Sequence, residues 1–182
     1  MKIRLLTGVL LLALLGASCP QKKFKITVTP PAAPKRVYDP AYGVAVMVPG
    51  DWKVTFRDGN PFLFAVAPGA GPYGPMMNVI TENITQRLNP YDYLQANIIT
   101  MRLSLQGMRI VRSGMELKNG INMSWVQYTY PRGKQVVEAV SSAQPQENRA
   151  YVVTAVAPEQ QFKNLEPNLR FIGQSLRIDP GR

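Results

Sequence analysis

Two segments with helical periodicity interrupt a chain that otherwise alternates in the manner of β-strands. The first is residues 89–106 and the second is residues 162–176. Asn89 and Pro90 suit the cap and the first position of a helix, whereas Pro167 predicts a kink or a restart in the second segment. In both segments large apolar residues recur at spacings of three and four, which places them on one helical face: Tyr91, Leu94, Ile98, Met101, Leu105, and then Phe162, Leu165, Leu169, Ile172 and Leu176.

Short segments with strand-like alternation lie before and between these two helices. Val44, Val46 and Val48 show the pattern most clearly. Turn signals such as Asp58-Gly59-Asn60-Pro61 and Asn119-Gly120 separate the strands, with further connections expected at 131–133 and 144–148. The order of strands, helix, strands and helix predicts the α+β class, in which helices pack on an antiparallel sheet. The other expected strands are 53–57, 62–66, 77–81, 108–115, 121–130, 135–142 and 149–155.

The composition narrows the chemistry that the chain can perform. Among 182 residues there is no histidine and one cysteine, which excludes histidine-based catalytic triads and most metal sites. The glycine- and proline-rich stretch 67–75 lacks the Gly-Lys-Ser/Thr of a phosphate cradle, and its prolines remove backbone donors. We expect this stretch to be a surface loop of the kind that carries contacts. The sequence therefore predicts a protein that is not an enzyme and uses no cofactor or metal.

The first 18 residues have the organisation of an export signal. Lys2 and Arg4 give a positive start, and an apolar run extends from Leu5 to Ala17. This run is shorter than the roughly 20 apolar residues of a helix that crosses a bilayer, and small residues end it. The residues before Cys19 resemble the lipobox of bacterial lipoproteins, in which the cysteine thiol accepts a diacylglyceryl group and becomes the first residue after cleavage. We therefore predict lipid attachment at Cys19.

The lipobox match has one departure and leaves one alternative. The pattern has Leu three residues before the cysteine, where this chain has Gly16, and Leu15 stands one step earlier. The alternative is an ordinary signal peptide that is cut near Ala17 and leaves a free thiol. Because a lone thiol cannot form an internal disulfide, lipidation is the simpler account of it. Pro20 stands where Asp would signal inner-membrane retention in some bacteria, which favours the outer membrane.

Residues 19–36 read as a tether between the lipid and a globular domain at 37–182. The tether has no acidic residue, and its prolines favour an extended path. As an alternative, its Thr-Val-Thr part could pair as an edge strand. Residues 37–182 hold fourteen basic residues against eleven acidic ones, so most of the net charge of +10 lies outside them. We predict that Lys22, Lys23 and Lys25 contact an anionic leaflet, where each contributes about 1 kcal/mol. The alternative is a solvated linker.

Five segments of the domain show distinctive strand, turn and helix patterns. They are YDPAYGVAVMVPGDW, NPYDYLQANI, ELKNGINMSWVQYTY, NRAYVVTAVAPEQQF and FIGQSLRI. In these segments the chain resembles the PsbP-like and DcrB-like family, which shares its fold with the Ran-binding Mog proteins, although Leu176 stands where the family has an aromatic residue. The resemblance implies a small α/β/α sandwich that binds other proteins. Its photosynthetic members associate with photosystem II, its DcrB-like members are periplasmic lipoproteins, and related domains act as chaperones for secreted effectors.

Two functional hypotheses follow. The first is a lipid-anchored, non-enzymatic envelope protein that binds or assists a protein partner at the membrane through the sheet face or loop 67–76. It requires large apolar residues to fill both helix–sheet interfaces. The alternative is a periplasmic carrier of a small apolar ligand, which requires a dry pocket above roughly 300 Å³ along helix 91–105. Nucleic acid is not an expected partner, because the domain is nearly balanced in charge and has no recognition motif.

The lipobox resemblance makes a direct prediction. We expect the mature amino-terminal peptide to begin at Cys19 and to carry acyl chains, which mass spectrometry of that peptide measures. A free thiol on Cys19, or a mature chain that begins at another residue, would contradict it.

Overall fold

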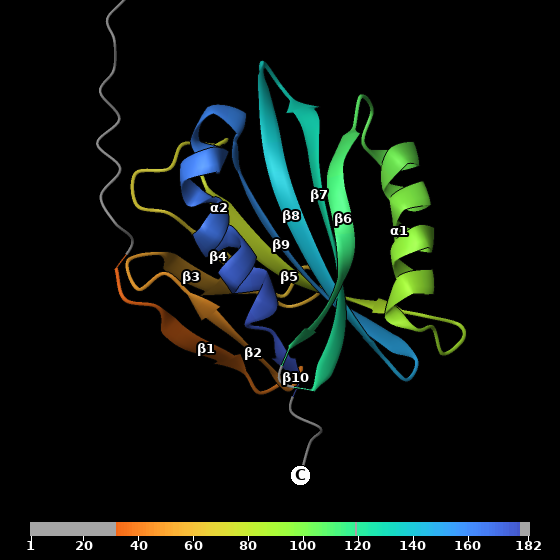
Figure 1. Cartoon of the computed structure of the whole chain (residues 1–182). Coiled ribbons are helices and arrows are strands. Elements are labelled where there is room, and N and C mark those ends of the chain that lie inside the picture. Colours follow the sequence, from red (N-terminus) through yellow and green to blue (C-terminus); the bar gives the residue numbers. More distant parts are fainter. Residues whose placement is uncertain (1–31, 119, 179–182) are drawn as a thin grey trace, which may run out of the picture.

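The computed structural model describes residues 32–118 and 120–178, which form two helices and ten strands (Figure 1). Each strand is antiparallel to its neighbours in the sheet. The elements in chain order are β1 (Lys35–Asp39), β2 (Val44–Val48), β3 (Lys53–Phe56), β4 (Leu63–Val66), β5 (Met76–Asn83), α1 (Pro90–Ser104), β6 (Arg109–Lys118), β7 (Ile121–Arg132), β8 (Gln135–Gln146), β9 (Arg149–Pro158), α2 (Glu159–Gln174) and β10 (Arg177–Ile178).

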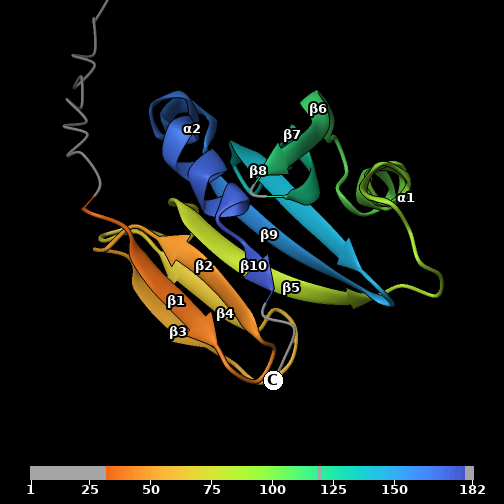
Figure 2. The same cartoon turned by 60° about the horizontal axis from the view of Figure 1, so that its bottom comes forward.

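The strands form two sheets of unequal size. The large sheet has the order β3-β4-β5-β9-β8-β7-β6, and the small sheet has the order β1-β2-β10. Helix α2 and the small sheet lie on one face of the large sheet, and α1 lies on the other (Figures 1 and 2). These layers confirm the expected α+β class, and β6 to β9 form the antiparallel meander that the turn signals predict.

The larger core lies between the large sheet, the small sheet and α2. The alternating valines of β2 point into it, and so do Val153 and Ala155 of β9. Helix α2 contributes its apolar stripe, in which Phe162, Leu169 and Ile172 are almost completely buried. The helix approaches β8 so closely that a Cβ at Gly173 would stand 2.4 Å from the Ser142 Oγ. A side chain at residue 173 would therefore clash with Ser142 unless that side chain or the helix moved.

The polar side of α2 is also fixed, because it lies over β6 and β7. Glu166 forms an ion pair with Arg112, and the Arg170 guanidinium stacks over the Trp125 ring at 4.1 Å from its centroid. Near the end of the helix, the Gln174 side chain donates to a Glu116 carboxylate oxygen at 2.7 Å. The helix is thus held by apolar packing on one side and by charged contacts on the other.

The smaller core lies under α1 on the opposite face. Leu94 and Ile98 of the helix pack against Val126, Val137 and Val156 of the sheet. The helix begins as the sequence predicts, because the Asn89 side chain accepts a hydrogen bond from the backbone N–H of Asp92.

The prediction of which α1 residues face the sheet is wrong at one aromatic position. Tyr91 is exposed, whereas Tyr93 is buried beside β5 and β9. The buried side of the helix is therefore centred on Leu94 and Ile98 and extends to Tyr93. Periodicity alone cannot separate two tyrosines that flank the centre of the stripe.

The carboxyl end of the domain departs from the helical prediction. Helix α2 continues through Pro167 without ending, but it stops at Gln174. Leu176 is buried outside the helix, and Arg177 and Ile178 pair with β2 as β10. The Ser175 hydroxyl accepts a hydrogen bond from the backbone N–H of Met47, which fixes this crossover onto the small sheet. A two-residue strand is too short to leave a pattern in the sequence.

The connections of the meander are shorter than expected. The pairing of β7 with β8 extends to Arg132 and Gln135, so Pro131 and Arg132 belong to a strand. The pairing of β8 with β9 extends to Gln146 and Arg149, which places most of the expected connection 144–148 in β8. The first strand likewise begins inside the expected tether, because Lys35 pairs with Val48 of β2. The Lys35 ammonium also donates hydrogen bonds to the carbonyl oxygens of Gly50 and Trp52.

No helix among the residues that the structure describes combines the length and the apolar character needed to cross a bilayer.

The packing of α2 predicts a large difference between two leucines. Leu169 is buried, whereas Leu103 on α1 is 84% exposed. We expect Leu169→Ala to lower the free energy of unfolding by about 2 to 5 kcal/mol, because it leaves a cavity in the larger core. The matched change Leu103→Ala should stay within about 0.5 kcal/mol of the parent. Urea denaturation measures both, and equal effects would contradict the assigned burial.

Candidate functional site

The domain has two opposite ends, at which the turns between neighbouring strands lie. The described chain begins at Ala32, whose carbonyl oxygen accepts a hydrogen bond from the Gly50 N–H after β2. We call this the near end. The β1–β2, β3–β4 and β8–β9 turns lie together at the opposite end, which we call the far end (Figure 1).

The residues expected to hold the lipid and to contact the membrane are Cys19, Lys22, Lys23 and Lys25, and they lie outside the described residues. Loop 67–76 is described, and it joins β4 to β5 at the near end. The Ala67 N–H donates to the Pro75 carbonyl oxygen at 3.0 Å, which closes the loop. With the first turns of α2, the loop borders a pocket of about 300 Å³. The expected contact loop therefore lies on the side where the chain enters the domain.

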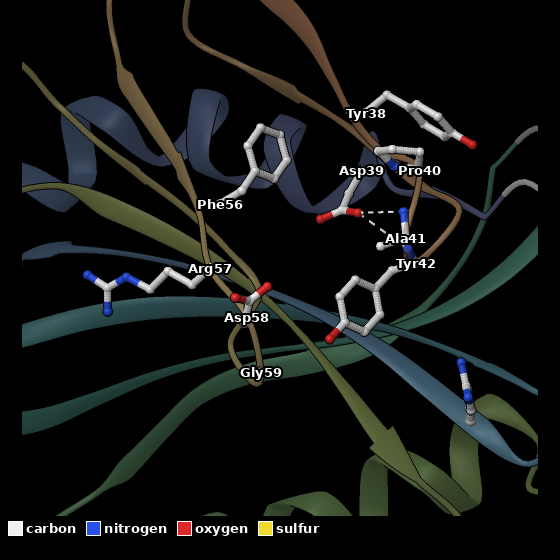
Figure 3. A pocket seen from close by; sticks show the side chains of 10 residues that line it. Tyr38, Asp39, Pro40, Ala41, Tyr42, Phe56, Arg57, Asp58 and Gly59 are labelled. Carbon is white, nitrogen blue, oxygen red and sulfur yellow. Dashed lines mark hydrogen bonds between the residues drawn. The ribbon is translucent and has the colours of Figure 1, made fainter.

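The far end holds an open cleft of about 830 Å³. The β1–β2 turn forms one wall, the β3–β4 turn forms the other, and the first residue of β9 lies at the rim (Figure 3). The lining residues are Tyr38, Asp39, Pro40, Ala41, Tyr42, Phe56, Arg57, Asp58, Gly59 and Arg149.

Asp39 shapes the first wall of the cleft. Asp39 is 6% exposed, and its Oδ1 accepts hydrogen bonds from the backbone N–H groups of Ala41 (2.9 Å) and Tyr42 (3.3 Å). Such a turn, in which an aspartate bonds the backbone that follows it, is a local preference of this residue. Gly43 completes the turn at a φ of 61°. The wall is therefore set by a short sequence, Asp39 to Gly43.

The second wall is attached to the large sheet. The Asn60 side chain donates to the Thr81 carbonyl oxygen at 2.7 Å and accepts from the Thr81 N–H at 3.1 Å, so the β3–β4 turn is tied to β5. The two walls also meet through aromatic stacking, since the rings of Tyr42 and Phe62 lie 4.0 Å apart and are nearly parallel. Both walls of the cleft are thus tied to the large sheet and to each other.

The side chains of the cleft differ in direction. Figure 3 shows the Phe56 ring and the carboxylates of Asp39 and Asp58 turned toward the space between the two turns, whereas Tyr38 and Arg57 extend away from it. The Arg57 guanidinium lies 4.4 Å from the centre of the Phe64 ring. Phe56 is 50% exposed, so the cleft offers an apolar surface beside two carboxylates. This combination suits a polypeptide segment with apolar and cationic side chains.

A second hollow, of about 460 Å³, lies on the other side of the β1–β2 turn. It shares Tyr38, Pro40 and Tyr42 with the cleft and is completed by the β8–β9 turn and Ile178. The β1–β2 turn therefore projects as a ridge between two depressions. A ridge flanked by depressions suits contact with another surface better than it suits enclosure of a small molecule.

The described part of the chain brings together no group of three or more acidic, histidine or cysteine side chains that could hold a metal ion. The acidic residues of the cleft serve a turn or face solvent, and no nucleophile with an adjacent base is placed there. What the geometry offers is binding through shape, aromatic surface and charge.

Among the described residues, the titratable groups whose pKa values are shifted are three tyrosines, and they lie under α1 and not in the cleft. Burial raises the pKa of Tyr128 to about 12 and also raises that of Tyr130. Burial and the hydrogen bond to Glu82 raise the pKa of Tyr93, whose hydroxyl donates to that carboxylate at 2.6 Å. These phenols stay protonated at neutral pH and are structural, since each belongs to the packing between α1 and the sheet.

Side chains fill both helix–sheet interfaces, which bears on the two functional hypotheses. Leu94 and Ile98 occupy the space under α1 where a carrier would need its pocket. A hollow of about 610 Å³ meets this helix at its first residue, Pro90, and not along its length. The central strands of the large sheet are covered by helices, so a partner would reach the ends of the domain rather than the middle of the sheet.

No family model matches the sequence, and no curated protein matches it. Solved structures do match. Cyanobacterial PsbP (CyanoP) from Synechocystis sp. PCC 6803 superposes with a TM-score of 0.63 over 81% of this chain and 93% of its own, at 13% identity. LpqN, involved in cell envelope biogenesis of Mycobacterium tuberculosis, gives a TM-score of 0.60 over 81% and 91%, at 18% identity.

A third match is the Ran-binding protein Mog1p of Saccharomyces cerevisiae, with a TM-score of 0.55 over 81% of this chain and 96% of its own, at 9% identity. Together these likenesses establish that the chain has the PsbP/Mog-like fold, as the resemblance predicts. At such identities they establish the fold alone.

The sequence did not indicate the far-end cleft. Its lining comes from three separate turns of two different sheets, and the packing of the small sheet on the large sheet brings them together. Each turn has a local signal, such as Asp58-Gly59, but a turn signal does not say which other turn lies beside it.

Asp39 provides a test of the cleft geometry. We expect Asp39→Ala to lower the free energy of unfolding by about 1 to 3 kcal/mol, because two backbone N–H groups lose a buried charged acceptor. Asp39→Asn keeps an acceptor oxygen and should cost less. Urea denaturation measures the difference, and equal costs for the two variants would contradict the role of the acceptor.

Proposed function

We propose that this chain is a lipid-anchored, non-enzymatic protein of the bacterial cell envelope that binds a protein partner through its far-end cleft. One observation carries the proposal. Two turns that are held rigidly by Asp39 and Asn60 present the exposed Phe56 ring beside carboxylates, at the end of the domain opposite to residue 32. A preformed surface of this kind loses little conformational entropy on binding.

The anchor is the second part of the proposal. Cys19 would carry the lipid, and Lys22, Lys23 and Lys25 would add electrostatic attraction to the membrane, since one acyl signal combined with a basic segment holds better than either alone. The domain would then lie in the periplasm, with the outer membrane favoured over the inner one. Anchoring also raises the local concentration of the domain beside a membrane partner.

The nature of the partner is supported by fold-level likeness. LpqN is described as involved in cell envelope biogenesis, and Mog1p is described as Ran-binding. Because folds host many functions, these descriptions favour a binding role without naming the partner. The cleft adds a chemical expectation. The partner segment should carry apolar and basic side chains, which match Phe56 and the exposed carboxylate of Asp58.

The carrier alternative has less support. It needs space between α1 and the large sheet, and that interface is occupied by a packed cluster of buried side chains. The far-end cleft is open and mixed in polarity, whereas sites for small apolar ligands bury most of the ligand surface.

Crosslinking in intact cells tests the proposal. The chain would be crosslinked in the envelope and purified from detergent-solubilised membranes, and the co-purifying proteins would be identified. We expect one recurrent envelope protein with the parent chain and at least about a tenfold loss of it with Phe56→Ala, since aromatic anchors dominate interface energies. Phe171→Ala is the matched control, because Phe171 is similarly exposed (41%) but lies on α2 away from the cleft.

A third variant separates the cleft from the near-end loop. Shortening residues 68–73 should leave the partner bound, because the loop lies at the opposite end of the domain. Loss of the partner with this variant but not with Phe56→Ala would move the binding site to the loop. A monomer that crosslinks to nothing would contradict the binding proposal itself and would direct attention to ligands extracted from the purified domain.

A further inference from the structure

We propose that the near end of the folded domain is itself a membrane-contact surface that binds anionic lipid headgroups. This inference deepens the proposed function, because it says which end of the anchored domain faces the bilayer. It rests on charge and exposure in the described residues and on the end at which the chain enters the domain, and these are independent of the far-end cleft.

Six segments that strand pairing and packing bring to one end form the near end. The Lys35 ammonium donates to the carbonyl oxygens of Gly50 (3.0 Å) and Trp52 (2.8 Å), so the start of β1 lies beside the start of β3. A Cβ at Gly133 in the β7–β8 turn would stand 2.6 Å from the Tyr73 hydroxyl, which places that turn beside loop 67–76. The segments are 32–35, 49–53, 66–76, 102–109, 130–136 and 158–163.

The excess positive charge of the described chain is concentrated at this end. The described residues hold fifteen basic side chains and ten acidic ones, a net of five positive charges. The near end holds two acidic residues, Asp51 and Glu159, against seven basic ones, which is also a net of five positive charges. The middle and the far end are therefore balanced. The basic residues are Lys35, Lys53, Arg102, Arg109, Arg132, Lys134 and Lys163.

Most of these cations face solvent. Lys53, Arg102, Arg109, Lys134 and Lys163 are exposed. The Lys35 ammonium donates hydrogen bonds to backbone carbonyl oxygens. The Arg132 guanidinium lies over the Tyr73 ring. The ion pair of the described residues joins Arg112 to Glu166 in the middle of the domain and neutralises none of the near-end charges.

Apolar side chains stand among the cations. Leu103 follows Arg102 and is 84% exposed, Val136 lies close to Lys134, and Tyr73 stacks beside Arg132. Basic residues interleaved with exposed leucine and tyrosine are typical of surfaces that lie at the level of lipid headgroups, where the cations meet phosphates and the apolar groups enter the interface.

The path of the chain favours a lipid surface over an acidic protein as the occupant. The domain begins at this end, and the thirteen residues from Cys19 to Pro31 can span at most about 45 Å. Lys22, Lys23 and Lys25 lie within this span of the sequence. With lipid on Cys19, the near end is the part of the domain held nearest to the bilayer, and the far-end cleft is directed away from it.

Vesicle binding tests the inference. The chain from residue 19 onward, with Cys19→Ser to remove the lipid, would be sedimented with vesicles of phosphatidylcholine alone or with roughly a third of phosphatidylglycerol. We expect binding to the anionic vesicles that added salt weakens, and little binding to the neutral ones. The paired change Arg102→Gln with Lys134→Gln should weaken binding about tenfold, since each cation near an anionic surface contributes a several-fold factor.

The control pair is Arg87→Gln with Arg149→Gln, which removes the same net charge from exposed far-end positions. It should change binding less than about twofold. Equal losses for the two pairs would overturn the inference, because net charge and not the near end would then drive binding. Unchanged vesicle binding of the Arg102→Gln, Lys134→Gln variant would overturn the inference as well. If this variant instead lost its crosslinked protein in cells, the near end would be a protein-binding surface and the lipid inference would be wrong.

Failure of this inference is separable from failure of the proposed function. An unlipidated Cys19 or the absence of a crosslinked partner would contradict the proposed function but leave the vesicle result intact. Conversely, a chain that is lipidated and partnered but indifferent to the near-end pair would refute the inference alone.

Discussion

Strand β9 is buried on both of its faces, and the rest of the structure depends on this constraint. Val153 and Ala155 face the larger core under α2, whereas Val152 and Val156 face the side of α1. A central strand with two apolar faces must be covered on each side, so the fold needs a helix above and a helix below the large sheet. The small sheet closes the remaining part of the larger core, where β2 contributes its three valines.

This layering directs function to the ends of the domain. The middle of the large sheet is occupied by packed helices, and the phenols buried there are held by burial and hydrogen bonds rather than by any reactive partner. The turns are free of that constraint, so they can carry charge and exposed aromatic groups at no cost to the core. The near end carries the positive charge, and the far end carries the cleft between two rigid turns. We propose that the far end faces a protein and, as a separate inference, that the near end faces lipid.

Sequence patterns predicted the architecture well because its strongest determinants are local. Asn89 caps α1 through its own side chain, and the alternation of Val44, Val46 and Val48 reports directly on a buried face. Features that need contacts distant in sequence were not predicted. The β10 strand depends on pairing with β2, and the far-end cleft depends on three separate turns. The charge asymmetry was hidden for the same reason, since its seven cations are spread from residue 35 to residue 163.

The central claim is that the domain stands on the membrane with its near end down and its cleft outward. The most direct measurement is the depth of fluorescent labels on the lipidated chain in anionic vesicles, using cysteines introduced at residues 134 and 58, since the native chain has no other cysteine than Cys19. The account predicts strong quenching of the label at residue 134 by headgroup-attached quenchers and little quenching at residue 58. Equal quenching at both positions, or stronger quenching at residue 58, would contradict it.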